Sequence, residues 1–266
     1  SGILLFFLCS FFPFFFFFLN NKTIDIIKDN KVFNNALYTN ATINQVVTSG
    51  SHHAILATDS EGLQELQEGK IIRPKQDFPN RTYFDLLWLN DSIFVAAGDT
   101  SIGIFNSQYS LLTEIKEKGF LYSPGKIYKD NKQQIWIANN NGLRIIKIFP
   151  QENQPPQVSI LPELSPLSLL KQKKINAIFQ DADGNMWFGT NAGLVKLQVD
   201  GTLQTITVKD GIASNIITCI FQDKEKNIWF GTAVGLSKLV TRSGIELYSM
   251  ENGIYSNDNL FILYPY

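Results

Sequence analysis

Short apolar segments alternate with polar turns along much of the chain, and this pattern predicts β-strands. Ile175–Gln180 is an apolar run rich in β-branched and aromatic side chains, as in a buried strand. A polar turn at 181–185 leads to a second strand at Met186–Thr190. Leu194–Leu197 alternates apolar and polar residues like a half-exposed third strand, and Leu203–Val208 completes the unit as an outer strand.

This four-stranded unit is repeated. Ile178–Leu197 reads IFQDADGNMWFGTNAGLVKL, and 42 residues later Ile220–Leu239 reads IFQDKEKNIWFGTAVGLSKL. Earlier copies are centred on Trp136, Phe94 and Ile55. Self-similarity at about 40–50 residues is typical of β-propeller blades, each a small four-stranded sheet. We therefore expect an all-β protein that is a β-propeller of about five blades.

Two segments depart from the regular spacing. The interval between the third and fourth copies is 51 residues long and contains the proline-rich stretch Phe149–Leu167, which is predicted to be a loop inserted between two blades. At the other end, the connector Asp210–Asn215 recurs at 252–257, again 42 residues on. The sequence therefore predicts the start of a sixth blade and an incomplete, C-terminally truncated propeller.

The first 19 residues differ from the rest of the chain. Residues 3–19 are almost continuously apolar, uncharged and rich in phenylalanine. The run is slightly long for the core of a signal peptide and at the short limit for a membrane span. We expect an export signal or uncleaved anchor at 1–19, outside the propeller, then a leader at 20–42 and the blades at 43–266. A phenylalanine-rich leader without such a role is the alternative.

The repeated phrase resembles the two-component regulator propeller repeat, D-x-x-G-N-x-W-F-G-T-x-x-G-L with a D-G-[IL]-x-S-N connector. The second copy departs from it at Lys226, which replaces a glycine, and the first two blades lack the tryptophan. The family forms the periplasmic sensing region of bacterial receptors with a kinase or diguanylate cyclase output. The resemblance therefore implies a propeller that binds an external ligand, often a carbohydrate fragment. The better copy carries the phrase on Asp181, Gly184, Asn185, Trp187, Phe188, Gly189, Thr190, Gly193 and Leu194.

Every residue of the repeated phrase has a scaffolding explanation. Glycine permits tight turns, tryptophan packs between neighbouring sheets, and aspartate and threonine form hydrogen bonds in turns. A residue repeated in each blade occupies the same structural position each time. We therefore expect the ligand to be bound by residues that break the repeat, on loops at one end of the ring or facing its channel. The candidates are Tyr122, Asn139–Asn141, Asn191 and Tyr255, and none is assigned singly.

Composition and charge argue against nucleic acid as a partner. Hydrophobic residues make up 44% of the chain and aromatic residues 13%, which is enough for a sizeable core. The formal net charge is −1, without a basic patch that could neutralise phosphates. Cys9 and Cys219 lie in apolar segments, and we expect no disulfide between them.

Motifs predict no catalytic residues, no bound metal and no cofactor. The only histidines, His52 and His53, are adjacent in a predicted loop, where neighbouring side chains point to opposite faces and cannot converge on one metal ion. P-loop, nucleophile-elbow and dinucleotide-binding motifs are absent from the sequence. The turn that begins at Asp181 is similar to a calcium loop, but Ala192 stands where a conventional EF-hand has glutamate.

Repeat and resemblance together predict the extracytoplasmic, ligand-sensing propeller region of a bacterial signalling receptor, with no enzymatic activity of its own. Its expected partners are a small-molecule or oligosaccharide ligand and the membrane, through the N-terminal segment or a C-terminal helix outside these 266 residues. A homodimer is expected for the full receptor, whose output domain is not in this chain. The alternatives are a propeller enzyme (a lyase or glycosidase), a free-standing binding scaffold and a remnant gene fragment.

Overall fold

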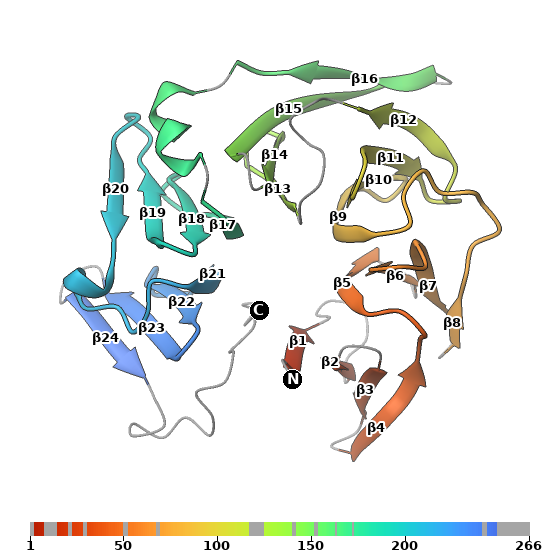
Figure 1. Cartoon of the computed structure of the whole chain (residues 1–266), viewed down its shortest axis with the longest axis horizontal. Helices are drawn as coiled ribbons and strands as arrows, with labels where there is room; N and C mark the ends of the chain where they lie inside the picture. Colours follow the sequence, from red (N-terminus) through yellow and green to blue (C-terminus); the bar gives the residue numbers. More distant parts are fainter. Residues whose placement is uncertain are drawn as a thin grey trace.

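The computed structural model describes residues 3–7, 15–20, 23–28, 31–49, 53–67, 70–116, 125–139, 142–151, 154–162, 164–171, 173–240 and 244–248. These residues form antiparallel four-stranded sheets that are arranged in a ring (Figure 1). Each sheet is a simple meander, whose strands follow one another in chain order. The described part of the chain contains short 3-10 helices and no α-helix. The predicted all-β propeller fold is confirmed.

Five of the sheets are the blades that the repeat predicted, and their first strands lie nearest the centre of the ring (Figure 1). Blade 1 consists of β5 (Ile43–Ser49), β6 (His53–Thr58), β7 (Leu63–Gln67) and β8 (Lys70–Ile72). Blade 2 consists of β9 (Tyr83–Asn90), β10 (Ile93–Gly98), β11 (Ile102–Asn106) and β12 (Leu111–Ile115). Blade 3 consists of β13 (Lys126–Lys129), β14 (Gln134–Asn139), β15 (Gly142–Gln151) and β16 (Gln154–Ile160).

The last two blades come from the two clearest copies of the repeat. Blade 4 consists of β17 (Ile175–Gln180), β18 (Met186–Thr190), β19 (Gly193–Leu197) and β20 (Leu203–Ile206). Blade 5 consists of β21 (Ile217–Gln222), β22 (Ile228–Thr232), β23 (Gly235–Val240) and β24 (Gly244–Tyr248). The connection between them contains the short 3-10 helix η2 (Val208–Asp210). The predicted start of a further blade, at 252–257, lies outside the described residues.

Residues 3–38 contribute an additional four-stranded sheet next to blade 1, the N-terminal sheet (Figure 1). Its strands are β1 (Ile3–Phe7), β2 (Phe15–Asn20), β3 (Thr23–Lys28) and β4 (Lys31–Tyr38). The structure thus pairs parts of the apolar run as strands of the ring, whereas the sequence predicted an export signal or anchor at 1–19 outside the propeller. Hydropathy alone does not separate the two, because Phe, Ile and Leu suit a strand as well as a membrane segment. The role of the apolar segment 1–19 as an export signal or anchor stays a prediction.

No helix within the described residues is both long and apolar enough to cross a membrane.

The proline-rich stretch is a strand and a helix, not the predicted loop. β15 continues to Gln151, β16 pairs with it, and the 3-10 helix η1 (Ser165–Leu170) follows. β16 tolerates Pro155 and Pro156 because it is the outermost strand of its blade, where a missing N–H need not break a ladder. The hydroxyl of Thr113 in β12 donates to the Pro156 carbonyl at 3.3 Å, so β16 also contacts blade 2.

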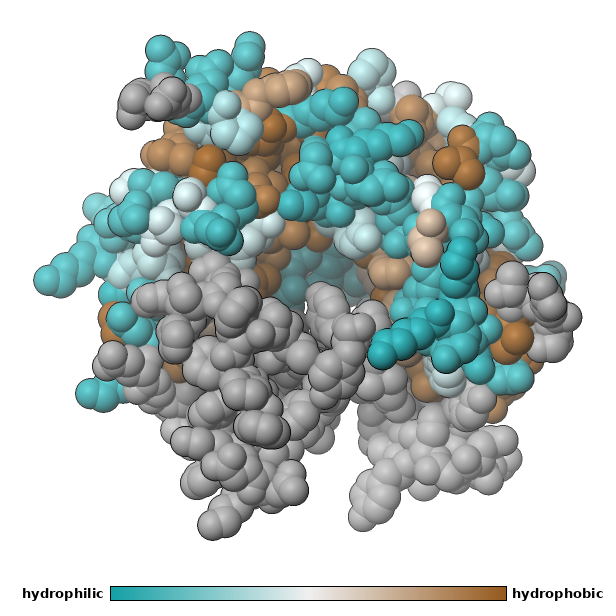
Figure 2. All heavy atoms as spheres, turned by 180° about the vertical axis from the view of Figure 1, so that it is seen from behind, coloured by the Kyte–Doolittle hydropathy of each residue, from teal (hydrophilic) through white to brown (hydrophobic). Residues whose placement is uncertain are grey.

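Buried side chains gather mainly between adjacent blades. Trp136 of blade 3 lies in one hydrophobic cluster with Phe188 of blade 4, with 5.7 Å between their ring centroids. Trp187 of blade 4 lies in the next cluster with Ile217 and Phe230 of blade 5. The predicted role of the repeated tryptophan in packing neighbouring sheets is confirmed. Hydrophilic side chains gather at the hollow near the middle of the face shown in Figure 2.

Candidate functional site

The turn between the first two strands of a blade is organised by the repeated aspartate. The Asp181 side chain is 7% exposed, and its Oδ2 accepts a hydrogen bond from Trp187 Nε1 at 2.7 Å. Its Oδ1 accepts from the backbone N–H groups of Asp183 at 3.0 Å and Asn185 at 2.8 Å. The Asn185 side-chain amide also donates to this carboxylate. The carboxylate therefore closes the turn and orients the indole.

The same aspartate–tryptophan bond occurs in two other blades. Asp130 accepts from Trp136 Nε1 at 2.8 Å, and Asp223 accepts from Trp229 Nε1 at 2.7 Å. Burial tends to raise the pKa of Asp223, but the hydrogen bonds from Trp229 and Asn227 outweigh it and hold the pKa below 3.8. This side-chain bond was not predicted from the sequence. Its signal was the constant spacing of six residues between Asp and Trp in three copies.

The turn between the second and third strands lies at the other end of each blade, and in blades 1, 4 and 5 a repeated threonine closes it. Thr190 Oγ1 donates to the Gly193 carbonyl at 2.7 Å and accepts from the Ala192 N–H at 2.9 Å. Thr232 Oγ1 donates to the Gly235 carbonyl at 2.9 Å in blade 5. The repeated Asp, Trp, Thr and Gly residues are therefore engaged in the scaffold.

Glutamine side chains join the first turns of neighbouring blades. Gln222 of blade 5 accepts from the Ala182 N–H of blade 4 at 2.8 Å and donates to the Lys226 carbonyl of its own turn at 3.1 Å. Gln180 of blade 4 accepts from the Asn131 N–H of blade 3 in the same way, at 2.8 Å. The turns at this end of the ring therefore form a connected rim.

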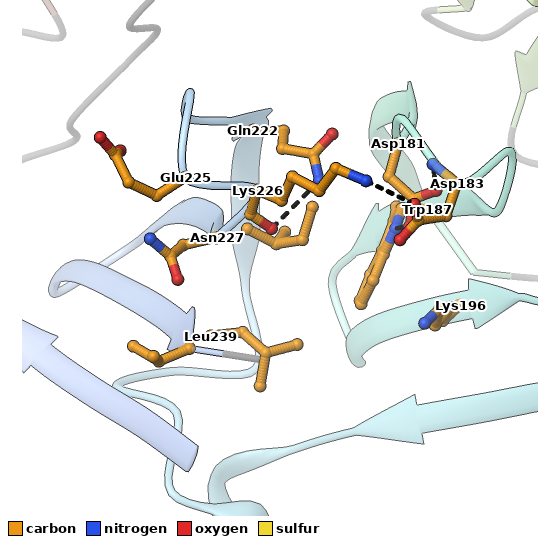
Figure 3. A pocket seen from close by; sticks show the side chains of 11 residues that line it. Asp181, Asp183, Trp187, Lys196, Gln222, Glu225, Lys226, Asn227 and Leu239 are labelled. Atoms are coloured by element: carbon orange, nitrogen blue, oxygen red, sulfur yellow. Dashed lines mark hydrogen bonds and ion pairs between the residues drawn. The ribbon is translucent and has the colours of Figure 1, made fainter. Parts of the chain in front are cut away.

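A cleft of about 450 Å³ opens on this rim between blades 4 and 5, which we call the rim cleft (Figure 3). It combines apolar side chains from β22 and β23 with charged and amide groups from the two first turns. Such a mixture suits a polar ligand, which needs a few fixed hydrogen-bonding groups on an apolar wall. Its lining residues are Asp181, Asp183, Trp187, Lys196, Gln222, Glu225, Lys226, Asn227, Ile228, Leu239 and Val240.

One charged group of the rim cleft, Lys226, departs from the repeat, because the other clear copy has a glycine at this position. Lys226 Nζ reaches across the cleft to Asp183 Oδ1 at 3.0 Å, whereas Glu225 points away from Asp183 (Figure 3). Both side chains of this ion pair are more than half exposed, at 60% and 62%, so water screens it and a ligand can displace it at little cost. On the other wall, Lys196 Nζ lies 4.9 Å from the centroid of the Trp187 ring.

A second cavity, of about 490 Å³, lies at the opposite end of the ring beside Gly62, and we call it the Gly62 cavity. The turn between β6 and β7 forms one wall, and the connection from β8 to β9 forms the other. Its lining residues are Ser60, Glu61, Gly62, Arg73, Gln76, Asp77, Phe78, Asn80 and Arg81. None of these residues was predicted to bind a ligand, and Gly62 itself matches the repeat as a scaffold residue.

Most of the candidates from the sequence cannot be placed. Tyr122, Tyr255, Asn140 and Asn141 lie outside the described residues, and so does the side chain of Asn139 at the end of β14. The exposed Asn191 accepts a hydrogen bond from the Lys174 N–H at 3.2 Å and lines neither cavity.

The expectation of no catalytic or metal site stays a prediction. His52 lies outside the described residues, and His53 begins β6. Among the described residues, no group of three His, Cys, Asp or Glu side chains is placed to hold a metal ion.

Residues 169–192 and 211–233 match the two component regulator propeller family, so the resemblance of the repeated phrase is confirmed. No curated protein sequence matches the chain.

Several solved structures share the fold. The extracellular domain of the hybrid two component system BT3049 from B. thetaiotaomicron has a TM-score of 0.72 and 16% sequence identity, covering 97% of this chain and 36% of that domain. Virginiamycin B lyase from Staphylococcus aureus has a TM-score of 0.68 and 15% identity, covering 93% of this chain and 83% of the lyase. PorZ of the type-IX secretion system of Porphyromonas gingivalis has a TM-score of 0.68 and 14% identity, covering 93% of this chain and 42% of PorZ.

Proposed function

We propose that this chain is part of the extracytoplasmic, ligand-sensing propeller region of a bacterial signalling receptor and is not itself an enzyme. One observation carries the proposal: two component regulator propeller repeats build blades of a ring that resembles extracellular domains of hybrid two component systems. The chain spans only 36% of the length of the BT3049 domain. The output domain, the membrane connection and a homodimeric full receptor are therefore parts of the proposal.

The rim cleft lies where a bound ligand would contact two blades at once. A small molecule or oligosaccharide in the rim cleft would touch the first turns of blades 4 and 5, which Gln222 already links. For such binding to become a signal, the ligand must bind one arrangement of the blades or domains more tightly than another. The exposed ion pair between Lys226 and Asp183 joins the two first turns across the rim cleft, and a bound ligand would take the place of this contact.

The proposal is tested by calorimetric titration of the purified chain with a panel of neutral and acidic oligosaccharides, together with a gene deletion in the native bacterium. We expect at least one oligosaccharide to bind, and the transcriptional response to that oligosaccharide to be lost in the deletion strain. Deletion of a gene for a fold-related protein without this repeat serves as the control. Absence of binding together with an unchanged transcriptional response would overturn the proposal.

A lyase is the second candidate, because virginiamycin B lyase matches nearly the whole chain over 83% of its own length. One of the similar structures is a catalytically inactive form of that lyase with quinupristin. Incubation of this chain with quinupristin, followed by mass spectrometry, separates the two candidates. We expect quinupristin to remain unchanged, whereas its conversion would favour the lyase.

A further inference from the structure

We propose that the Gly62 cavity binds the anionic group of a hydroxylated ligand through the guanidinium groups of Arg73 and Arg81. This proposal deepens the proposed function by naming a ligand class. It rests on that function only in assuming that the bound ligand leads to a signal. The cavity volume, about 490 Å³, lies within the range of about 300–1,000 Å³ that is usual for ligand pockets.

The two arginines occupy defined positions of the repeat. The connections from β8 to β9 (73–82) and from β20 to β21 (207–216) are equally long. The Gly62 N–H donates to the Arg81 carbonyl at 2.7 Å, just as the Gly193 N–H donates to the Asn215 carbonyl at 2.7 Å. Arg81 therefore corresponds to Asn215, and Arg73, as the first residue of its connection, corresponds to Thr207.

In the connection between blades 4 and 5, these two positions have scaffolding roles. Thr207 begins a capping box with Asp210, in which Thr207 Oγ1 accepts a hydrogen bond from the Lys209 N–H at 3.3 Å. Asn215 Oδ1 accepts from the Val208 N–H at 2.9 Å and closes the connection. Arginine at either position cannot accept these hydrogen bonds, since a guanidinium has only donors. Both arginines therefore stand at positions that close the connection between blades 4 and 5, and they cannot close their own connection in the same way.

The connection from β8 to β9 is held in place by Asn80, so the two arginines are not needed for this purpose. The Asn80 side chain is 2% exposed, accepts from the Thr100 N–H at 2.8 Å and donates to Ser101 Oγ at 3.1 Å. The connection is thereby fixed to the turn between β10 and β11 of the next blade. Phe78 adds an edge-on contact with Tyr83, with 6.2 Å between the ring centroids. The cavity wall is therefore formed before any ligand arrives, which lowers the entropic cost of binding.

The guanidinium groups of Arg73 and Arg81 are exposed and form no hydrogen bond or ion pair with the described residues. Each guanidinium presents a planar set of N–H donors that matches a carboxylate, sulfate or phosphate group. The segment 70–81 carries four cationic residues and one carboxylate, in a chain whose net charge is −1. Lys70 and Lys75 do not line the cavity, whereas the carboxylates of Glu61 and Asp77 do. The preference for an anion therefore rests on the two guanidinium groups, which are unpaired among the described residues, and on their donor geometry, and not on a net positive charge of the cavity.

The rest of the cavity suits hydroxyl groups. Asp77 and Glu61 line it, and one oxygen of Glu61 accepts from Gln64 Nε2 at 2.5 Å. Carboxylate oxygens accept hydrogen bonds from hydroxyls, and Ser60 and Gln76 add polar groups of both kinds. An acidic saccharide combines the anionic group with the hydroxyls, so we take a uronic acid as the probe.

The test is calorimetric titration of the chain with D-glucuronate, D-glucose and inorganic sulfate. The variants are Arg73→Thr and Arg81→Asn, each of which restores the residue of the other connection and thus favours folding. Lys75→Gln is the control, because it removes one charge from the same connection at a residue that does not line the cavity. Thermal unfolding of each variant checks that the fold is retained.

We expect glucuronate to bind at least about tenfold more tightly than glucose, and each arginine variant to weaken its binding about tenfold. Lys75→Gln should change the affinity less than about twofold. Binding of sulfate without glucuronate would assign the anion to an inorganic source and overturn the saccharide assignment. Equal binding of glucose, or an equal loss in Lys75→Gln, would overturn the proposal.

The two proposals fail in different ways. If neutral oligosaccharides of the panel bind while glucuronate and sulfate do not, the anionic ligand class is wrong and the sensor function stands. If no saccharide or anion binds at all and the deletion strain responds normally, both proposals are wrong.

Discussion

At the scale of single residues, the repeated aspartate contributes more than its place in a turn suggests. Asp181 is nearly buried, and backbone, amide and indole donors all reach its carboxylate. A buried charge is tolerated only when it is paired in this way, and its loss leaves several donors unsatisfied. The side chain of the exposed Asp183, two residues later, forms one ion pair among the described residues, with Lys226 across the rim cleft.

We predict that Asp181→Ala lowers the free energy of unfolding by about 3 kcal/mol, because the buried Trp187 N–H and the turn lose their acceptor. Asp183→Ala, the control, should cost less than about 1 kcal/mol, as expected for an exposed ion pair. Urea unfolding followed by tryptophan fluorescence measures both. Equal losses in the two variants would contradict a special role of the buried carboxylate.

The fourth residue of the same turn gives a second prediction. Gln133, Gly184 and Lys226 occupy this position in three blades, with φ of 59°, 88° and 67°. A side chain in this left-handed region is strained. Gln133→Gly should therefore raise the free energy of unfolding by about 1 kcal/mol, and Gly184→Ala should lower it by a similar amount. Opposite shifts of the unfolding midpoint in urea are the expected result, and shifts of the same sign would contradict it.

At the scale of elements, adjacent blades approach each other closely where β18 meets β21. A Cβ atom on Gly189 would lie 2.8 Å from Ile217 Cγ2, so only glycine lets the second strand of blade 4 lie this near the inner strand of blade 5. The backbone of Gly189 needs no left-handed conformation, and its role is therefore steric. The repeated glycine thus sets the spacing between blades.

We predict that Gly189→Ala lowers the free energy of unfolding by about 1–3 kcal/mol through overpacking. A double-mutant cycle with Ile217→Ala isolates the cause, since that variant removes the atom that the new methyl group meets. In the Ile217→Ala background, Gly189→Ala should cost less than about 1 kcal/mol. An unchanged cost in that background would show that the contact with Ile217 is not the reason.

At the scale of the whole molecule, several carboxylates that link elements make stability depend on pH. Burial tends to raise the pKa of Asp59, but hydrogen bonds from Thr42 and Ser60 hold it below 3.8. Asp223 has a lowered pKa for the related reason given above. Asp85 is the opposite case: its burial between inner strands raises its pKa, although Lys126 and the Ile127 N–H act against the rise.

A carboxylate with a lowered pKa in the folded state stabilises the protein above its unfolded pKa, and this stability is lost as the pH falls through the folded value. The raised pKa of Asp85 acts in the reverse sense, so its contribution is present below 3.8 and is lost as the pH rises. We predict that Asp223→Asn reduces the loss of unfolding free energy between about pH 5 and about pH 3, and that Asp85→Asn increases it. Urea unfolding at several pH values measures both slopes, and a change of either in the opposite direction would contradict the prediction.

The sequence by itself determined the blade, because its strands are joined by short turns whose residues are local. Trp187, Thr190 and Gly193 could be given scaffolding roles from their spacing alone, and their hydrogen bonds close within a few residues. The family resemblance followed from the same repeated phrase. Within a blade, residues that are close in the sequence are also close in space, so the local sequence pattern was enough to predict the fold of the blade.

The tertiary structure alone decided what happens between blades and at the ends of the ring. An apolar run such as Phe15–Asn20 suits a strand or a membrane segment, and only its partners in the N-terminal sheet distinguish them. The strand β16 required β15 beside it before its prolines could be understood. Arg73 and Arg81 face one cavity only because the connection folds against the turn at Gly62. Such contacts depend on ring geometry that joins residues from different blades, and no local pattern encodes it.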